Sequence, residues 1–274
     1  MNIKNYKKFY LNKIKSIKER TIFMFSELRE YGFFYCLHMC LALLVTEIRY
    51  SKPKKRSAVY QDFSFSKDMI NDTKIPSYYK KNYTFNYMDS FSLNVFIWEK
   101  FFNDYIKKSA PINYLEIGSF EGRSSVYVLE NLNNAYCYFV DPFEEYEEMT
   151  KSTKQTKFNL IFANFKSNVS YFNKRFEIHK KTSDEFFKTN NKSILFDLIY
   201  IDGSHIFKDV YKDAVNSDKF LNKDGYLIFD DFFWFWYKDL KSNPFFAINK
   251  FLYQNKKNYK IIYLGNQLIL KKIA

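Results

Sequence analysis

The sequence predicts an α/β fold: a doubly wound, mostly parallel sheet of seven strands that ends in an antiparallel hairpin, preceded by a helical N-terminal extension. From residue 90 onward, short apolar runs alternate with amphipathic stretches, a pattern typical of a parallel sheet covered by helices on both faces. The last two runs are separated only by Leu264-Gly265-Asn266, and so short a turn joins antiparallel strands. The 274-residue chain is 22% aromatic and has only 6 glycines, which excludes disordered and collagen-like classes.

The first half of the main domain is expected to begin with a lead-in helix. Residues 90–108 predict this helix because large apolar side chains, among them Phe91, Val95 and Trp98, recur on one side. Strands are expected at the uninterrupted apolar runs, and helices where apolar residues recur every three or four positions. In chain order the elements are a strand at Asn113–Ile117, a helix at Arg123–Leu132, a strand at Tyr136–Val140, a helix around Glu147–Val169 and a strand at Phe176–Lys180. A short helix then starts near Ser183, whose hydroxyl can cap it.

The second half continues the alternation and then departs from it. The run FDLIYI predicts a strand at Phe196–Ile201, followed by a helix at Phe207–Phe220. A strand at Tyr226–Phe229 and a helix at Pro244–Gln254 come next. The strands Tyr259–Tyr263 and Gln267–Leu270 form the closing hairpin, so the sheet is expected to have seven strands.

Residues 1–57 predict a basic helical extension with an apolar centre. They carry 13 basic and 4 acidic side chains and therefore most of the net charge of +13. The apolar stretch Tyr31–Val45 has 15 residues, whereas a helix needs roughly 20 to span a membrane. Two interpretations stay open: the extension contacts an anionic membrane surface peripherally, or its apolar part packs on the main domain.

The composition also bears on partners and compartment. The positive charge suggests a nucleic-acid partner, but 37 of the 43 basic residues are lysines, whereas base readout and bidentate phosphate contacts favour arginine, so the composition disfavours this partner. The three cysteines, Cys36, Cys40 and Cys137, cannot form a disulfide framework and indicate a reducing compartment. We expect a cytoplasmic protein, with membrane association through the extension as the open alternative.

A glycine-containing turn follows the first predicted strand, and an acid follows the second. Gly118 and Gly122 allow the backbone to turn tightly and approach a ligand. Their G-x-x-x-G spacing differs from the G-x-G-x-x-G of pyrophosphate-binding loops, which disfavours NAD. Asp141 ends the second strand, where a carboxylate can accept both hydroxyls of a ribose. An isolated aspartate there would be only a turn former, but beside the glycine turn it predicts a ribose ligand.

Three more acids follow the fourth and fifth predicted strands. Asp202 ends the fourth strand, and Asp230 and Asp231 end the fifth. Because the carboxyl ends of adjacent parallel strands meet at one sheet edge, we expect these carboxylates to converge. Three converging acids repel one another unless a cation is present, and Mg²⁺ prefers such oxygen ligands. The alternative is that Asp202 and Asp231 only cap the following helix and turn.

With these residues the chain resembles class I S-adenosylmethionine-dependent methyltransferases, over about residues 90–274. The pattern E-x-G-x-x-x-G, the acid after the second strand and the terminal hairpin are shared with that family, and the fold it implies is Rossmann-like. The resemblance implies that Gly118, Ser119 and Gly122 border the amino-acid part of the cofactor, and that Glu116 helps to hold its ammonium group. By position after the third strand, and not by a motif match, Ser183 or Asp184 is expected to lie near the adenine.

The segment Asp202-Gly203-Ser204-His205 and the pair Asp230-Asp231 resemble the branch that includes macrocin and rhamnosyl O-methyltransferases. The resemblance implies metal-assisted O-methylation of a sugar, a glycan or another small molecule. Mg²⁺ at Asp202, Asp230 and Asp231 would hold the acceptor hydroxyl. His205 would take the hydroxyl proton.

The remaining expectations concern the acceptor. Six consecutive aromatic residues, Phe232–Tyr237, predict an acceptor wall or lid, although core packing accounts for part of them. We divide the chain into the extension 1–57, an acceptor-site cover with the lead-in helix at 58–110, and the cofactor-binding domain 111–274. Two other functions stay open: a nucleic-acid methyltransferase, suggested by the positive charge, and a non-catalytic membrane-associated module that retains the fold.

Overall fold

The computed structural model describes residues 37, 79–87, 89–144, 158–172, 174–190, 194–232 and 243–274. Several predictions fall outside these residues: the extension except Leu37, the cover at 58–78, the start of the helix around 147–157, and the aromatic run after Phe232. In the described part of the chain, no helix combines the length and apolar character needed to cross a bilayer.

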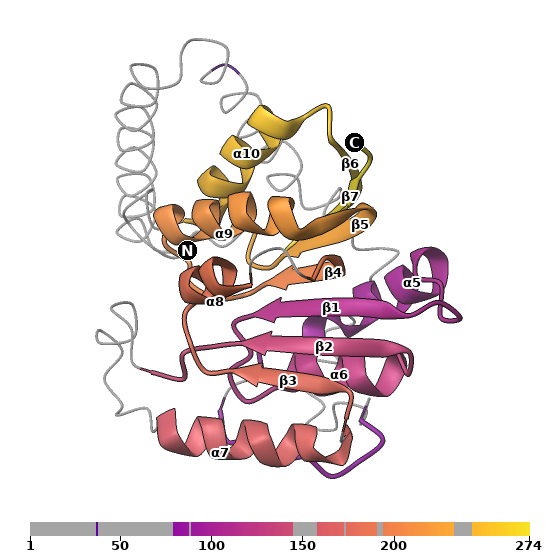
Figure 1. The fold of residues 1–274 in the computed structure, drawn as a ribbon, viewed down its shortest axis with the longest axis vertical. Coiled ribbons are helices and arrows are strands. Elements are labelled where there is room, and N and C mark those ends of the chain that lie inside the picture. Colours follow the sequence, from indigo (N-terminus) through magenta and orange to yellow (C-terminus); the bar gives the residue numbers. More distant parts are fainter. Residues whose placement is uncertain are drawn as a thin grey trace, which may run out of the picture.

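The described residues form one seven-stranded sheet in the order β3-β2-β1-β4-β5-β7-β6 (Figure 1). The first five strands of this order are parallel, and β7 runs antiparallel to both β5 and β6. This arrangement confirms the predicted parallel sheet with a closing hairpin. The strands are β1 (Ile112–Ile117), β2 (Ala135–Val140), β3 (Phe176–His179), β4 (Phe196–Ile201), β5 (Leu221–Phe229), β6 (Tyr259–Leu264) and β7 (Leu268–Lys272).

Helices cover both faces of the sheet. One layer consists of α5 (Val95–Tyr105), α6 (Arg123–Asn131) and α7 (Phe158–Val169), followed by a short 3₁₀ turn, η3 (Ser170–Phe172). The other consists of α8 (Ser183–Thr189), α9 (Phe207–Phe220) and α10 (Pro244–Asn255), as Figure 1 shows. Successive strand residues point to opposite faces, so Tyr114 packs in the first layer and Leu115 in the second. Two hydrophobic cores therefore enclose the sheet and hold its carboxyl edge rigid.

Two predicted elements have wrong boundaries for local reasons. The Asp89 carboxylate accepts the N–H groups of Phe91 and Ser92 at 3.1 and 2.8 Å, and a 3₁₀ turn, η1 (Ser92–Asn94), follows. The lead-in α-helix therefore begins only at Val95, and it ends at Tyr105 because Ile106 is extended. Strand β5 begins at Leu221 rather than Tyr226, since polar residues in its first half conceal the strand pattern.

The cap of α8 is also corrected. Thr182, not Ser183, is the N-cap: its hydroxyl accepts the Glu185 N–H at 3.3 Å, and the Glu185 carboxylate accepts the Thr182 N–H at 2.9 Å. This is a reciprocal capping box. The Ser183 hydroxyl donates instead to Asp213 of α9 at 2.5 Å, so it joins two helices.

Residues 79–87, which we call the lead-in segment, are clamped to the layer of α6 and α7. The buried Glu130 carboxylate accepts the Lys80 N–H at 2.8 Å and the Tyr83 hydroxyl at 2.7 Å. Asn168 exchanges two hydrogen bonds with the backbone of Thr84, at 2.8 and 2.9 Å. These contacts carry the segment to the carboxyl edge of the sheet, where Tyr87 reaches the cavity described next.

Candidate active site

A cavity of about 820 Å³ lies at the carboxyl ends of the parallel strands. This is the edge at which open α/β sheets bind ligands. Most of the residues that line it come from the turn after β1, the ends of β2, β4 and β5, and the N-terminal parts of α6, α7, α8 and α9. Predicted site residues on its wall are Gly118, Ser119, Asp141, Ser183, Asp202, His205, Asp230 and Asp231.

The two glycines of the turn after β1 are required by close packing. Both have positive φ, +88° at Gly118 and +85° at Gly122. A Cβ on Gly118 would lie 2.1 Å from the Asp202 carbonyl oxygen, and one on Gly122 would lie 2.9 Å from the Phe165 ring. Gly118 therefore lets the β1 turn touch the end of β4, which brings Asp202 next to this turn. Gly122 instead seats α6 against α7 and does not line the cavity.

Asp141 organises the same turn. Its Oδ2 accepts the N–H groups of Ser119 and Phe120, both at 2.9 Å, and its Oδ1 accepts the Phe143 N–H at 2.6 Å. Burial raises the pKa of this carboxyl, and these three hydrogen bonds oppose the rise. A carboxylate has about four lone-pair positions, so one stays available for a ligand hydroxyl. The ribose role stays a prediction that this arrangement permits.

Glu116 lies beneath the turn and does not line the cavity. Its fully buried carboxylate accepts the hydroxyls of Ser124 and Ser125 at 2.6 and 2.9 Å, and that of Tyr114 at 2.9 Å. Burial raises its pKa to about 7. This geometry holds the first turn of α6 against β1, and it places no Glu116 oxygen on the cavity wall.

Ser183 lies on the cavity wall beside two acids of α9, Asp209 and Asp213. Because it donates to Asp213, its hydroxyl is anchored to α9. Burial raises the pKa of Asp213 to about 7. The place of Ser183 beyond β3 agrees with the expected position, and its contact with adenine stays a prediction.

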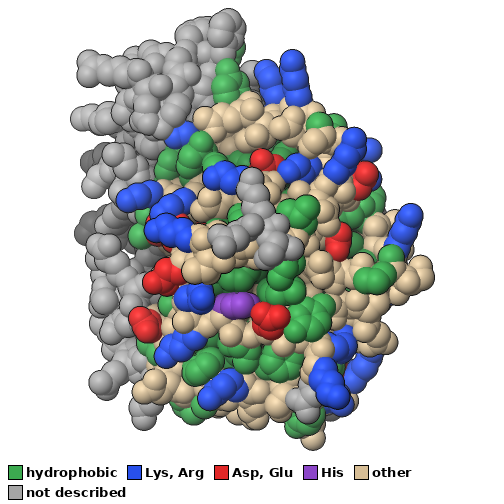
Figure 2. Space-filling view, viewed as in Figure 1, with side chains coloured by type: hydrophobic (Ala, Val, Ile, Leu, Met, Phe, Trp, Pro, Cys, Tyr) green, Lys and Arg blue, Asp and Glu red, His purple; other side chains and the backbone are tan. Residues whose placement is uncertain are grey.

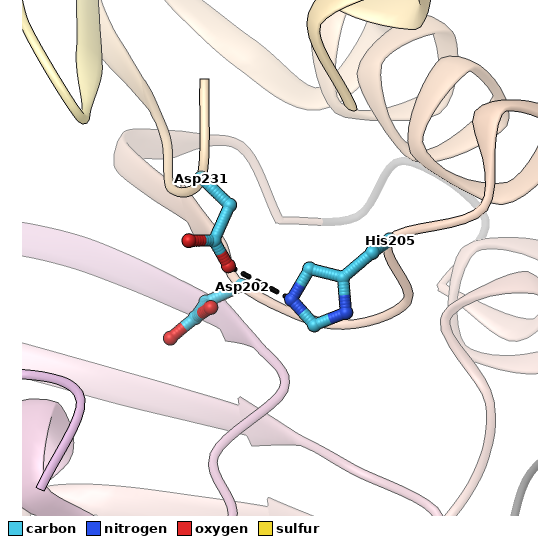
Figure 3. Close-up of side chains that lie close together, drawn as sticks. All are labelled: Asp202, His205 and Asp231. Carbon is cyan, nitrogen blue, oxygen red and sulfur yellow. Dashed lines mark hydrogen bonds and ion pairs between the residues drawn. The ribbon is translucent and has the colours of Figure 1, made fainter. Parts of the chain in front are cut away.

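His205, Asp202 and Asp231 form the second functional group of the cavity (Figure 3). His205 Nε2 lies 2.8 Å from Asp231 Oδ2, and one ligand atom from each of the three residues falls within 4.8 Å of the others. Burial, followed by the charges of Asp230 and Asp231, raises the pKa of Asp202 well above its usual range. Two carboxylates and one imidazole this close, all three half-buried, fit a divalent cation.

Asp230, the third predicted metal ligand, is placed differently. Its Oδ2 meets the Tyr200 hydroxyl, the Gln267 amide at 3.1 Å and the Asn94 amide at 3.4 Å. Its Oδ1 accepts the Asp231 N–H at 2.8 Å. Burial, followed by the charge of Asp231, raises the pKa of Asp230 to about 6. The structure brings all three predicted acids to one place, with Asp230 the most engaged by protein donors.

Tyr87, Ser90 and Phe91, which lie within the predicted cover and lead-in helix at 58–110, line the cavity beside the β1 turn. Two other parts of the site were not predicted. Glu121, also on the wall, accepts the N–H groups of Asn86 and Tyr87 at 3.0 Å. Tyr200 and Gln267 contact Asp230. Only Tyr200 had a sequence signal, because it stands two residues before Asp202 and so faces the same side of β4.

The aromatic run after β5 is only partly described. Its first member, Phe232, is buried and packs on Phe245 with ring centroids 5.1 Å apart, so this ring belongs to the core and not to an acceptor wall. Residues 233–237 lie outside the described residues. On the face in Figure 2, the described lysines and arginines are spread among other side chains and form no single basic stripe.

Known proteins resemble this chain in sequence or in fold. Residues 115–232 match the model of a family described as a methyltransferase domain. The chain is 29% identical over 181 residues to the uncharacterized protein R132 of Acanthamoeba polyphaga mimivirus, and the matched region covers 64% of this chain and 74% of that protein. A putative O-methyltransferase from Klebsiella pneumoniae has a similar fold, with a TM-score of 0.50 and 10% identity over 69% of this chain and 84% of that one. A putative caffeoyl-CoA O-methyltransferase from Staphylococcus aureus covers 81% of this chain and 98% of its own, at 14% identity and a TM-score of 0.49.

Proposed function

We propose that the protein, whose residues 115–232 match a methyltransferase-domain family, is a class I S-adenosylmethionine-dependent methyltransferase and methylates a hydroxyl group of a sugar, a glycan or another small molecule with the help of a divalent cation. One observation carries the proposal. The β1 turn with Asp141 and the group Asp202, His205 and Asp231 open into the same cavity. A methyl donor and an ion-bound hydroxyl could therefore meet there.

The donor would be held at the β1 turn. The backbone at Gly118 and Ser119 would border its amino-acid part, Asp141 would accept a ribose hydroxyl, and Ser183 would lie beside the adenine. Glu116 would act from below by fixing the turn and α6, since its carboxylate is occupied by Ser124, Ser125 and Tyr114.

The acceptor would be held at the acids. Asp202, Asp230 and Asp231 would hold the cation, which is expected to be Mg²⁺, and His205 would take the proton of the acceptor hydroxyl. When bound, the donor supplies a methyl group already activated on sulfonium, and the cation lowers the pKa of the hydroxyl. His205 Nε2 lies 2.8 Å from Asp231 Oδ2, and this contact orients the imidazole ring. The main task of the protein is then to align oxygen, methyl carbon and sulfur and to exclude water.

A screen of labelled methyl transfer tests the proposal. The protein is incubated with labelled S-adenosylmethionine and a panel of nucleotide sugars, glycans, phenols and polynucleotides, with Mg²⁺ or with a chelator. We expect transfer to a hydroxyl that depends on the ion and is lost in Asp202→Ala. Transfer that survives both the chelator and this substitution would remove the metal role. Transfer only to polynucleotide, or cofactor binding without any transfer, would favour one of the two alternative functions.

The N-terminal extension bears on where the protein is located and not on the reaction. We propose that residues 1–57 contact an anionic membrane surface, on the strength of their 13 basic side chains and the apolar stretch Tyr31–Val45. Co-sedimentation of the full chain with vesicles of phosphatidylserine and phosphatidylcholine, compared with phosphatidylcholine alone, tests this. Equal sedimentation with both would contradict it.

A further inference from the structure

A buried tyrosine hydroxyl lies between two acids of the active site. Tyr200, in the middle of the sheet on β4, is fully buried. Its hydroxyl donates to Asp202 Oδ2 at 2.9 Å and also makes a short contact with Asp230 Oδ2. A phenol can donate one hydrogen and its oxygen can also accept one, so this hydroxyl can contact both carboxylates and link the position of each to that of the other.

The surroundings leave the bridge little freedom. The Tyr200 ring stands edge-to-face on Trp98, with centroids 4.9 Å apart. The Trp98 indole N–H donates to Gln267 Oε1 at 2.8 Å. Because an indole N–H can only donate, the amide oxygen of Gln267 must face Trp98, and its NH₂ group must face Asp230. Gln267 Nε2 lies 3.1 Å from Asp230 Oδ2, as this orientation requires.

Four elements thus converge on Asp230: α5 through Trp98, β4 through Tyr200, β5 through Asp230 itself, and the closing hairpin through Gln267. Asp230 in turn fixes the backbone of Asp231, because its Oδ1 accepts the Asp231 N–H. The network therefore reaches both Asp202 and Asp231, which belong to the group that faces the cavity.

We infer that Tyr200 and Gln267 are positioning residues of the acid cluster, which hold Asp202, Asp230 and Asp231 in the arrangement that binds the cation. The inference rests on the metal role in the proposed function. Loss of a group that orients a metal ligand from behind typically weakens metal binding by about 10-fold to 100-fold. Tyr200 would act entirely through the carboxylates that it contacts.

The neighbouring strand supplies a matched control. Tyr114 on β1 is equally buried, and its hydroxyl donates to Glu116 two residues later at 2.9 Å, as Tyr200 does to Asp202. Glu116 does not line the cavity. Tyr114→Phe therefore removes the same hydroxyl from the same kind of environment without touching the acid cluster.

The test is Mn²⁺ binding to the full-length protein, followed by the paramagnetic resonance signal of free Mn²⁺ in the absence of donor and acceptor. We expect Tyr200→Phe to weaken Mn²⁺ binding about tenfold. In Tyr114→Phe the affinity should stay within about twofold of wild type. S-adenosylhomocysteine affinity, measured by calorimetry, should be unchanged in Tyr200→Phe, because the hydroxyl does not reach the β1 turn. Gln267→Met, which keeps the shape but removes the amide, should weaken Mn²⁺ binding as well and serves if Tyr200→Phe does not fold.

Mn²⁺ affinity equal to wild type in Tyr200→Phe and in Gln267→Met would overturn the inference while leaving the proposed function intact. Equal weakening in Tyr200→Phe and Tyr114→Phe would also overturn it, because the effect would then be a general loss of sheet stability. A wild-type protein that binds no Mn²⁺ would instead refute the metal role itself, and the inference would fall with it.

Discussion

The substitution Glu121→Ala should release the lead-in segment from the cavity wall. The Glu121 carboxylate is almost fully buried, at 1% exposure, and accepts three donors: the N–H groups of Asn86 and Tyr87 at 3.0 Å and the Asn164 amide at 2.9 Å. Each donor left unsatisfied costs roughly 1–3 kcal/mol. Asn86 is exposed, so water can replace part of the loss, and the lower end applies. We expect a local destabilisation of about 3 kcal/mol.

Hydrogen exchange measures this directly. A loss of about 3 kcal/mol corresponds to amide exchange about 100-fold faster at Asn86 and Tyr87. S-adenosylhomocysteine should also bind more weakly, because Tyr87 lines the cavity beside the β1 turn. Glu130→Ala is the matched control: Glu130 holds Lys80 and Tyr83, so its loss should accelerate exchange there and spare Tyr87. Exchange at Asn86 and Tyr87 that rises less than about threefold in Glu121→Ala would refute the reasoning.

Three further predictions concern the turn, a cap and a buried acid. Gly118→Ala should abolish S-adenosylhomocysteine binding in calorimetry, because the new Cβ would lie 2.1 Å from the Asp202 carbonyl oxygen and the residue has a φ of +88°, which alanine disfavours. Retained affinity would show that the turn tolerates the displacement of this carbonyl. Thr182→Ala should lower the free energy of unfolding in urea by about 1 kcal/mol, and no change would mean that the capping box contributes nothing. Glu116 has a folded pKa of about 7 against 4.5 in its ordinary state, so it stabilises the protonated folded protein below pH 4.5, and this stability is lost as pH rises to 7. Glu116→Gln should remove on the order of 3 kcal/mol of that decline in urea unfolding series from pH 4.5 to 7.5, and an unchanged decline would assign it to other groups.

The elements that the sequence predicts best are a strand buried on both faces and a helix with one buried face. The bounds of β4 (Phe196–Ile201) and α9 (Phe207–Phe220) agree with the prediction to the residue, because uninterrupted apolar runs and helical spacing leave no choice there. Ends decided by hydrogen bonds are predicted less well. Thr182 and Ser183 are both good caps, and only Glu185, three residues after Thr182, distinguished them.

The candidate site follows the same division. Strand ends could be located in the sequence, so the meeting of Asp141, Asp202 and Asp231 at one cavity was predictable from topology. Topology could not predict which carboxylate oxygens already accept hydrogen bonds from other parts of the protein. Glu116 turns away from the cavity because Ser124 and Ser125 of α6 satisfy it, and Asp230 faces Gln267, which comes from the far end of the chain. Such contacts between distant segments leave no local pattern in the sequence.

The most direct test is a crystal structure of the protein with S-adenosylhomocysteine and Mn²⁺. The account predicts the cofactor product along the β1 turn with its ribose at Asp141, and an anomalous Mn²⁺ peak bound by Asp202 and Asp231 in the same cavity. A cavity without the cofactor product, or an Mn²⁺ peak elsewhere with these two carboxylates free of the ion, would contradict it.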